Sequence, residues 1–265
     1  MRKKTQEPFD KYEYYSRSVQ SPDADVSFMH DTYKEIRGKK PKILREDFCA
    51  AFANCCSWVK QGSGYSAYGI DIDKEPIDYG FKNYYSENTP SEQKRIHILR
   101  KDVLHAGLPK ADVACALNFS YFCFKERKTL AKYFLNTYKS LNKDGIFVLD
   151  CFGGTDCQEQ NEEETVHDGF SYFWDQGFFD PITHHCKFAI HFKRKKERKR
   201  NNVFTYDWRM WTIPELCDLL KEVGFKTTTV YWEGTTRKGE GNGIFTPAKV
   251  GEECESWVAY IVGAK

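Results

Sequence analysis

Acidic and amide side chains follow four short apolar segments of the sequence, at positions where strands of a parallel sheet would end. They are Glu46 with Asp47, then Asp71, Asp102 and Asn118. Ligands of open parallel α/β sheets bind beyond the carboxyl ends of the strands. A carboxylate there can accept hydrogen bonds from ribose hydroxyl groups or from the amino group of a purine. The pattern therefore predicts a site for an adenosine-containing ligand.

Two of these acids receive specific roles. Asp71 is the first choice for the ribose, because it follows the acid of the first strand by about 25 residues, close to the spacing of dinucleotide-binding folds. Asp102 could accept a hydrogen bond from the amino group of adenine, and the backbone N–H of Val103 could donate a hydrogen bond to a ring nitrogen. The simpler alternative is that each acid only caps the helix that follows it.

The elements that must position these residues alternate as in βαβ units, which predicts an α/β fold with a mostly parallel sheet. Seven strands are expected, at 42–47, 66–73, 95–102, 112–118, 145–152, 225–232 and 255–263. Helices are expected at 50–62, 74–85, 126–141 and 213–224. The glycine-rich stretch 233–253 is predicted to be an exposed loop.

Residues 153–211 interrupt this alternation and predict an inserted antiparallel cap rich in aromatic residues. The regular pattern resumes at Thr212, which with Glu215 forms the signature of a capping box. The predicted domains are an N-terminal helical lid or extension over 1–41, a sheet domain over 42–152 and 212–265, and the cap over 153–211.

The composition narrows the class of protein. A chain of 265 residues with 29% charged residues is one large domain or one domain with an insertion. No apolar run approaches the roughly 20 residues of a membrane span, and the first residues lack the apolar region of a signal peptide, so we expect a cytoplasmic protein without a membrane partner. The ten cysteines form no CxxC pair and lie in apolar segments, which predicts reduced, buried thiols.

Several motifs together resemble those of the class I S-adenosylmethionine-dependent methyltransferases. They are the first-strand acid and turn EDFCAAF at 46–52, Asp71, Asp102 in RKDV, the approach LNKDGIFVLD to the fifth strand, and the final strand pair. The resemblance covers 42–152 and 212–263. It implies a Rossmann-like sheet with helices on both faces, S-adenosyl-L-methionine as cofactor and methyl transfer as activity.

The resemblance also implies which residues contact the cofactor. They are Tyr15, Glu46, Phe48, Cys49, Ala50, Asp71, Ile72, Asp102, Val103, Asn118, Phe119 and Ser120. One departure concerns the turn, where the family has three glycines and this chain has Phe48, Ala50 and Phe52. Phenylalanine adopts a positive φ reluctantly, so we expect a turn of another shape. A non-catalytic protein that has lost the cofactor therefore stays an alternative.

The segment ALNFSYF at 116–122 resembles the stretch after the fourth strand in small-molecule N-methyltransferases of the glycine type. It is also similar to the NPPY motif of enzymes that methylate amide or adenine nitrogens, but it lacks both prolines. The first comparison is favoured, and it implies that Asn118 lies at the methionyl end of the cofactor. It also makes Tyr12, Tyr14 and Tyr15 candidates for a lid.

The cap is expected to supply most residues that bind the methyl acceptor. The candidates for catalysis are Tyr121, His185, His191, Tyr206 and Arg209. A histidine would serve as base if the acceptor must lose a proton, and Arg209 could pair with a substrate carboxylate. No metal site is predicted, because the two histidines lack a third ligand at a suitable spacing.

The expected function is methyl transfer to an N or O nucleophile of a small molecule. The alternative is an RNA-modifying methyltransferase that uses the basic run at 193–200, which holds seven basic residues and one acid. That run lies at the predicted tip of a hairpin, where a solvated charge cluster is the ordinary outcome, so nucleic acid is not the favoured partner. The sequence does not predict the oligomeric state.

Overall fold

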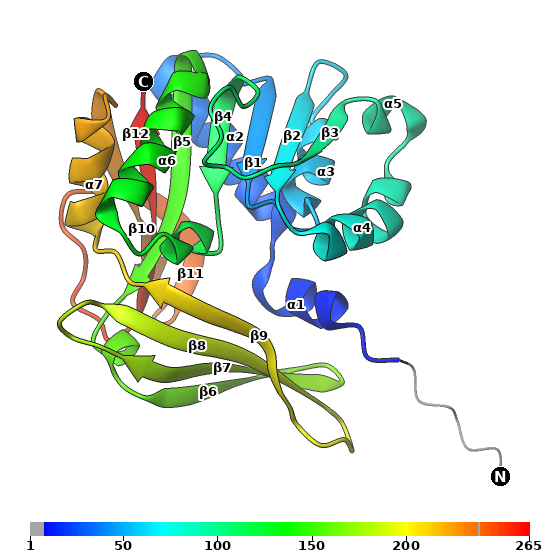
Figure 1. Ribbon diagram of the computed structural model, residues 1–265, viewed down its shortest axis with the longest axis vertical. Helices are drawn as coiled ribbons and strands as arrows, with labels where there is room; N and C mark the ends of the chain where they lie inside the picture. Colours follow the sequence, from blue (N-terminus) through cyan, green and yellow to red (C-terminus); the bar gives the residue numbers. More distant parts are fainter. Residues whose placement is uncertain (1–7, 238) are drawn as a thin grey trace.

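The computed structural model describes residues 8–237 and 239–265, so the first seven residues of the predicted extension lie outside the described residues. The described residues form two sheets. The larger has eight strands in the order β11-β10-β12-β5-β4-β1-β2-β3, and the smaller has four in the order β6-β7-β8-β9. Figure 1 shows the smaller sheet beneath the larger one.

Five parallel strands form the centre of the large sheet. They are β1 (Ile43–Asp47), β2 (Ser66–Asp71), β3 (Ile96–Arg100), β4 (Ala111–Ala116) and β5 (Leu141–Gly153). The strand β1 pairs with β2 on one side and with β4 on the other. The strand order therefore reverses between β1 and β4, which is the topological switch point where such sheets bind ligands.

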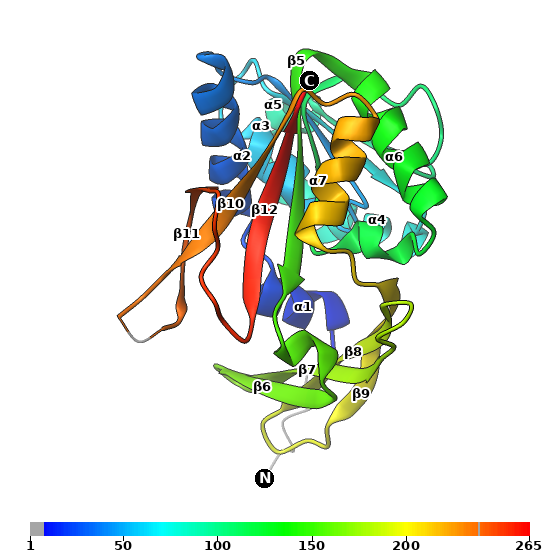
Figure 2. The ribbon, with the colours of Figure 1, turned by 90° about the vertical axis from the view of Figure 1, so that its left-hand side faces the viewer.

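Helices cover both faces of this sheet (Figure 2). They are α2 (Pro22–Arg37), α3 (Ala53–Val59), α4 (Lys74–Asn83), α5 (Pro90–Gln93), α6 (Arg127–Ser140) and α7 (Ile213–Glu222). Met29 of α2 and Trp58 of α3 belong to the core on one face, and Phe134 of α6 and Leu219 of α7 to the core on the other. The capping box of α7 is confirmed, because Thr212 and Glu215 bond reciprocally.

The sheet has eight strands where seven were predicted, because part of the expected loop 233–253 is a strand. The last strands are β10 (Thr227–Thr235), β11 (Gly241–Ala248) and β12 (Trp257–Ala264), and β11 pairs antiparallel with the outer edge of β10. The segment of β11 contains two glycines and a proline, which local propensity disfavours in strands. Hydrogen bonds to β10 compensate for that local preference.

The cap is a four-stranded antiparallel sheet of β6 (Asn161–His167), β7 (Phe170–Phe179), β8 (His185–Arg194) and β9 (Arg200–Arg209). The strands β7, β8 and β9 overlap the segments 170–174, 186–194 and 203–211, for which the sequence predicts antiparallel strands. The first, β6, lies in the acidic run, whose glutamates are poor strand formers. Pairing with β7 supplies the hydrogen bonds that stabilise it.

The helix α1 (Lys11–Val19) lies between the two sheets (Figure 1). The Tyr12 ring contacts Tyr79 of α4 at 4.9 Å and Phe204 of β9 at 5.9 Å, between ring centroids. Tyr14 instead packs against Phe170, in the small core of the cap. The helix α1 therefore links the sheet domain to the cap.

Two expectations from composition can be compared with the described residues. None of their helices is long and apolar enough to cross a bilayer. Seven of the ten cysteines are buried, but Cys123 and Cys254 are exposed and Cys217 is intermediate. The prediction of buried thiols was therefore wrong for those three, which lie in the short helical turn after β4, in the segment before β12 and in α7.

Candidate functional site

The turn after β1 has three residues in the left-handed region, at the positions where the family has glycine. The φ values are 58° for Phe48, 44° for Ala50 and 49° for Phe52. The expectation of another turn shape was wrong, since the backbone adopts the conformation that glycine would favour. Each such residue costs about 1–2 kcal/mol relative to glycine, so other contacts must hold the turn.

Hydrogen bonds and glycines on neighbouring elements hold this turn. The Ala50 N–H donates to Asp71 Oδ2 at 2.7 Å. Gly69 of β2 leaves room for Cys49, because a Cβ on Gly69 would lie 2.8 Å from the Cys49 sulfur. Gly80 of α4 leaves room in the same way for the Phe52 ring. The small residues needed for close approach thus lie on the elements that pack behind the turn.

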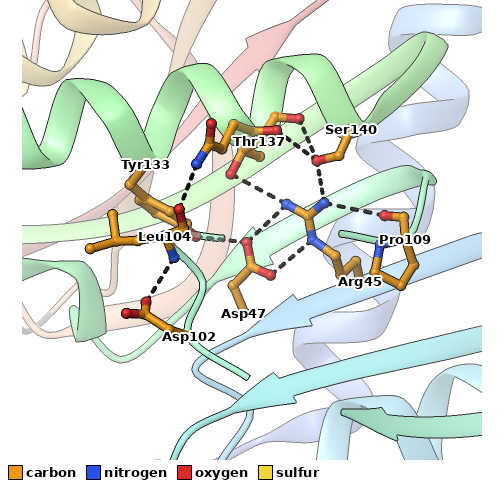
Figure 3. A network of polar contacts seen from close by, with 9 residues as sticks. Arg45, Asp47, Asp102, Leu104, Pro109, Tyr133, Thr137 and Ser140 are labelled. Carbon is orange, nitrogen blue, oxygen red and sulfur yellow. Dashed lines mark hydrogen bonds and ion pairs between the residues drawn. The ribbon is translucent and has the colours of Figure 1, made fainter. Parts of the chain in front are cut away.

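A buried ion pair fixes the end of β1 (Figure 3). Arg45 Nε and Nη2 donate to Asp47 Oδ1 and Oδ2 at 2.8 and 3.0 Å, and both side chains are fully buried. Tyr133 of α6 donates its hydroxyl to Asp47 at 2.9 Å, and Arg45 also bonds Thr137 and Ser140. The network connects the turn after β1 to α6, and the positive charge of Arg45 balances the negative charge of Asp47.

Two other buried acids stand at the switch point. Glu46 accepts hydrogen bonds from Asn54 Nδ2 at 3.0 Å and from the Cys55 N–H at 3.2 Å. Asp150 of β5 accepts the N–H groups of Asn118 and Phe119 at 2.6 and 2.9 Å. Those two residues have φ values of 54° and 55°, so Asp150 holds the strained turn after β4.

Burial raises the pKa of Glu46 and of Asp150 to about 7. An acid whose pKa is higher in the folded state than in the unfolded state stabilises the fold at low pH, and this stability is lost as the pH rises through the folded pKa. We therefore expect the ligand-free protein to lose at least about 1 kcal/mol of unfolding free energy between pH 5.5 and pH 8.

Urea unfolding followed by circular dichroism at the two pH values measures this change. Glu46→Gln and Asp150→Asn should each remove about half of the pH dependence. Stability that is equal or greater at pH 8 would show that these acids are ionised in the folded protein without penalty.

Three adjoining cavities open at the carboxyl ends of the parallel strands. The first, of ≈ 150 Å³, is a slot between the ends of β2 and β3, lined by Phe48, Asp71, Ile72, Lys101, Asp102, Val103, Cys123 and Phe124. Ile72 is 65% exposed, which is unusual for a large apolar side chain and leaves an apolar edge at the slot. The slot suits a flat ring flanked by hydrogen-bonding groups.

The second cavity, of ≈ 210 Å³, lies between the turn after β1 and the helix α1. Phe48 lines both this cavity and the slot. Glu46, Cys49, Ala50, Asn118 and Ser120 form one wall, and Tyr12, Tyr15, Phe204 and Tyr206 form the other. The helix α1 and the cap therefore close this cavity from the side opposite the sheet.

The third cavity, of ≈ 250 Å³, is a chamber between the sheet domain and the inner face of the cap. Tyr15, Asn118 and Tyr206 line both the chamber and the second cavity. Burial raises the pKa of the Tyr15 phenol to about 12 and that of the Tyr206 phenol well above its ordinary value. Both phenols are thus neutral at physiological pH and can serve as hydrogen-bond donors.

Solved structures with this architecture include methyltransferases. A S-adenosylmethionine-dependent methyltransferase from Clostridium acetobutylicum ATCC 824 superposes with a TM-score of 0.70 at 14% identity, over 96% of this chain and 97% of that one. The amino pentose methyltransferase CalS10 from Micromonospora echinaspora has a TM-score of 0.66 at 11% identity, over 98% and 99%. The sugar N-methyltransferase KedS8 from Streptoalloteichus sp ATCC 53650 has a TM-score of 0.63 at 13% identity, over 100% and 98%.

The chain has the fold of these methyltransferases. The predicted Rossmann-like α/β class is therefore confirmed, inserted antiparallel cap included. No family model matches the sequence, and no curated protein matches it.

All twelve residues that the sequence assigned to the cofactor line one of the three cavities. Some of them also form hydrogen bonds within the protein. Asp71 also accepts the Asp73 N–H at 2.9 Å, and Asp102 accepts the Leu104 N–H at 2.8 Å. Simple helix capping, the alternative considered for the acids at the strand ends, is found at Asp73, two residues after Asp71, whose side chain caps α4.

Of the five predicted catalytic residues, Tyr206 lines two cavities and the other four line none of the three. Tyr121 is fully buried in the core and donates its hydroxyl to the Asp150 carbonyl. Arg209 bonds Glu215 at 3.0 Å and stacks on Trp211 at 3.8 Å, so it is not placed to pair with a substrate carboxylate.

The two histidines are excluded from the chamber by the alternation of the cap strands. Ile190 and Trp208 line the chamber, and their neighbours His191 and Arg209 face the outer side. His185 shares the outer parity of His191. The expectation of a histidine base facing the acceptor is therefore not met by this arrangement.

The His191 ring lies beside Asp175 and Glu162, and one possible ligand atom of each residue lies within 4.8 Å of the other two. Its Nδ1 accepts the Asn202 N–H at 2.9 Å, so in the neutral ring the proton is on Nε2, which points to Asp175 at 3.0 Å. Lys199 binds Glu162 at 2.5 Å. The described contacts within this cluster are ion pairs and hydrogen bonds between strands of the cap.

Sequence reasoning missed several residues of the site. Asp150 could have been noticed as the single acid inside the apolar strand GIFVLDCF, because a buried acid needs partners. Glu163, Tyr172 and Trp174 line the chamber from β6 and β7. Nothing local distinguished Glu163 from the other glutamates of its run.

Proposed function

We propose that this protein is an S-adenosyl-L-methionine-dependent methyltransferase that acts on an N or O nucleophile of a small molecule. The observation that carries the proposal is the row of three adjoining cavities at the switch point, ending under the cap. The likeness of the fold to those of an amino pentose methyltransferase and a sugar N-methyltransferase supports it.

The residues present fit the cofactor. The slot beside Asp102 and Val103 would hold the adenine, and Asp71 would hold the ribose, since each of its oxygens keeps a free lone pair beyond its backbone bond. The second cavity would hold the methionyl end beside Glu46 and Ala50. The φ values of the turn also weaken the alternative of a protein that has lost the cofactor.

When bound, the cofactor supplies an activated methyl group, which forms a bond to the acceptor's lone pair as its bond to sulfur breaks and leaves the electron pair on sulfur. The protein's own part is to bind, align and exclude water. Alignment of two reactants in one site can supply several kcal/mol of the rate acceleration. The strained turn at Asn118 and Phe119, held by Asp150, lies where the second cavity and the chamber adjoin, since Asn118 lines both.

The size of the chamber and its place beneath the cap favour a small acceptor over RNA. Cavities of ≈ 210 and ≈ 250 Å³ that join are of the order of small-molecule sites, roughly 300–1,000 Å³. Three basic residues of the predicted nucleic-acid run form ion pairs within the cap: Arg194 and Arg200 with Glu197, and Lys199 with Glu162. Two acids thus offset part of the positive charge of this run.

Asp71→Ala tests the assignment of the cofactor site. We expect it to weaken binding of S-adenosylhomocysteine by about 10- to 100-fold, as for the loss of charge-assisted hydrogen bonds worth about 1.5–3 kcal/mol. Isothermal titration calorimetry measures the affinity. Asp78→Asn is the matched control, because this exposed acid pairs with Lys74 outside the cavities. Wild-type affinity in Asp71→Ala would remove the ribose assignment.

A further inference from the structure

The chamber under the cap is walled by aromatic rings. Seven of its thirteen lining residues are aromatic, and they come from α1, the turn after β4, β5, β7 and β9. Trp174 lies 5.8 Å from Tyr206 and 6.4 Å from Trp208, between ring centroids. Trp174 and Tyr206 keep part of their surface accessible, so ring faces are available to a ligand.

The charged residues described in the lining of the chamber and of the second cavity are all acids. Among the described residues that line the chamber and the second cavity, none is Lys, Arg or His, whereas Glu46, Asp47, Asp73 and Glu163 are acids. Arg45 balances Asp47 from behind. The other three acids have no ion-pair partner within the described part of the chain.

Glu163 is the one charged residue in the lining of the chamber as described. It lies on β6 directly opposite Trp174 of β7, and Trp174 is opposite Ile190 of β8. The register therefore places a carboxylate in the same row as the aromatic wall. Glu163 is exposed, so it stands where the chamber meets solvent.

We propose that the methyl acceptor is a cationic amine without a carboxylate or phosphate group, which binds as an ammonium ion between the aromatic rings and Glu163. This inference rests on the proposed function, since it names the acceptor class of that site. Ring faces attract cations, an effect worth about 0.5–2 kcal/mol. An anionic group would enter a lining without a positive partner, where desolvation is not compensated.

The ammonium must give up one proton before its nitrogen has a lone pair to form the new bond to carbon. The Glu163 carboxylate at the open side of the chamber can accept this proton and release it to water. The site thus needs no buried histidine base, in agreement with the outward position of His191.

Binding of probes that cannot be methylated tests the inference apart from turnover. Choline, its neutral isostere 3,3-dimethyl-1-butanol, and betaine, which adds a carboxylate, are titrated by calorimetry into protein saturated with S-adenosylhomocysteine. We expect choline to bind about 5- to 30-fold more tightly than the neutral isostere, and betaine to bind more weakly than choline. Equal affinity for choline and its isostere would overturn the inference.

Two variants assign the preference to the chamber. Glu163→Gln should lower choline affinity about 3- to 10-fold and leave the affinities for the isostere and for S-adenosylhomocysteine unchanged. Glu164→Gln removes the same charge from the opposite face of β6 and should change none of them. An unchanged choline affinity in Glu163→Gln would contradict the role of this carboxylate.

The experiment separates the two proposals. S-adenosylhomocysteine binding without any preference for choline overturns the acceptor class and leaves the methyltransferase intact. A preference for choline in a protein that binds no S-adenosylhomocysteine supports the aromatic site and overturns the proposed function.

Discussion

Asp47→Ala is expected to lower the free energy of unfolding by about 3–5 kcal/mol, because it leaves the Arg45 guanidinium buried without its counter-charge. It also removes the acceptor of the Tyr133 hydroxyl and so loosens α6 from the end of β1. Urea unfolding monitored by tryptophan fluorescence measures the loss. It would be among the largest single-residue effects in this fold, since most substitutions cost 0.5–3 kcal/mol.

The double variant Arg45→Met with Asp47→Leu separates the ion pair from the space it fills. Apolar residues of similar volume often replace a buried pair without loss, so the double variant should recover most of the stability. A loss below about 1 kcal/mol in Asp47→Ala would show that water reaches the pair and that the network is not a rigid support.

Gly80→Ala is expected to destabilise the protein by about 1–3 kcal/mol and to weaken cofactor binding. In the interior of a helix, glycine to alanine usually stabilises by roughly 0.5–1 kcal/mol. Here the added Cβ would overlap the Ala51 carbonyl and the Phe52 ring, and thus displace the turn after β1. Urea unfolding and calorimetry with S-adenosylhomocysteine report the two effects.

Ala50→Gly is the counterpart within the turn itself. It relieves one left-handed alanine and should leave stability unchanged or raise it by about 0.5–1 kcal/mol. If Gly80→Ala proved more stable than the wild type, the packing of α4 would not be what holds the turn.

The parallel strands and the acids at their ends could be predicted because their signals are local. Apolar runs of strand length mark β1 to β5, and the acid or amide that follows each of the first four runs is a property of the sequence alone. The shape of the turn at Phe48 could not be predicted, because the glycines that allow it, Gly69 and Gly80, lie on other elements. Their role appears only when these elements pack.

The acceptor site was only partly predictable for a related reason. The aromatic content of the cap predicted that the cap covers the acceptor site. Side-chain chemistry favoured His185 and His191 as catalytic residues, but the alternation of side chains along the strand turns both outward. The alternation of Phe188, Ile190 and Phe192 contains that information. Glu163 could not be predicted, because its position at the chamber depends on the register of β6. The acidic composition of that segment did not indicate a strand.

The other assignments depend on the proposed transfer of a methyl group from S-adenosylmethionine to a small amine. The most direct measurement supplies S-adenosylmethionine with a trideuterated methyl group, together with a low-molecular-weight cell extract, and follows labelled products by mass spectrometry. We expect a labelled amine with the wild type and much less of it with Asp71→Ala. Labelling with the wild type that does not exceed the Asp71→Ala background would contradict it.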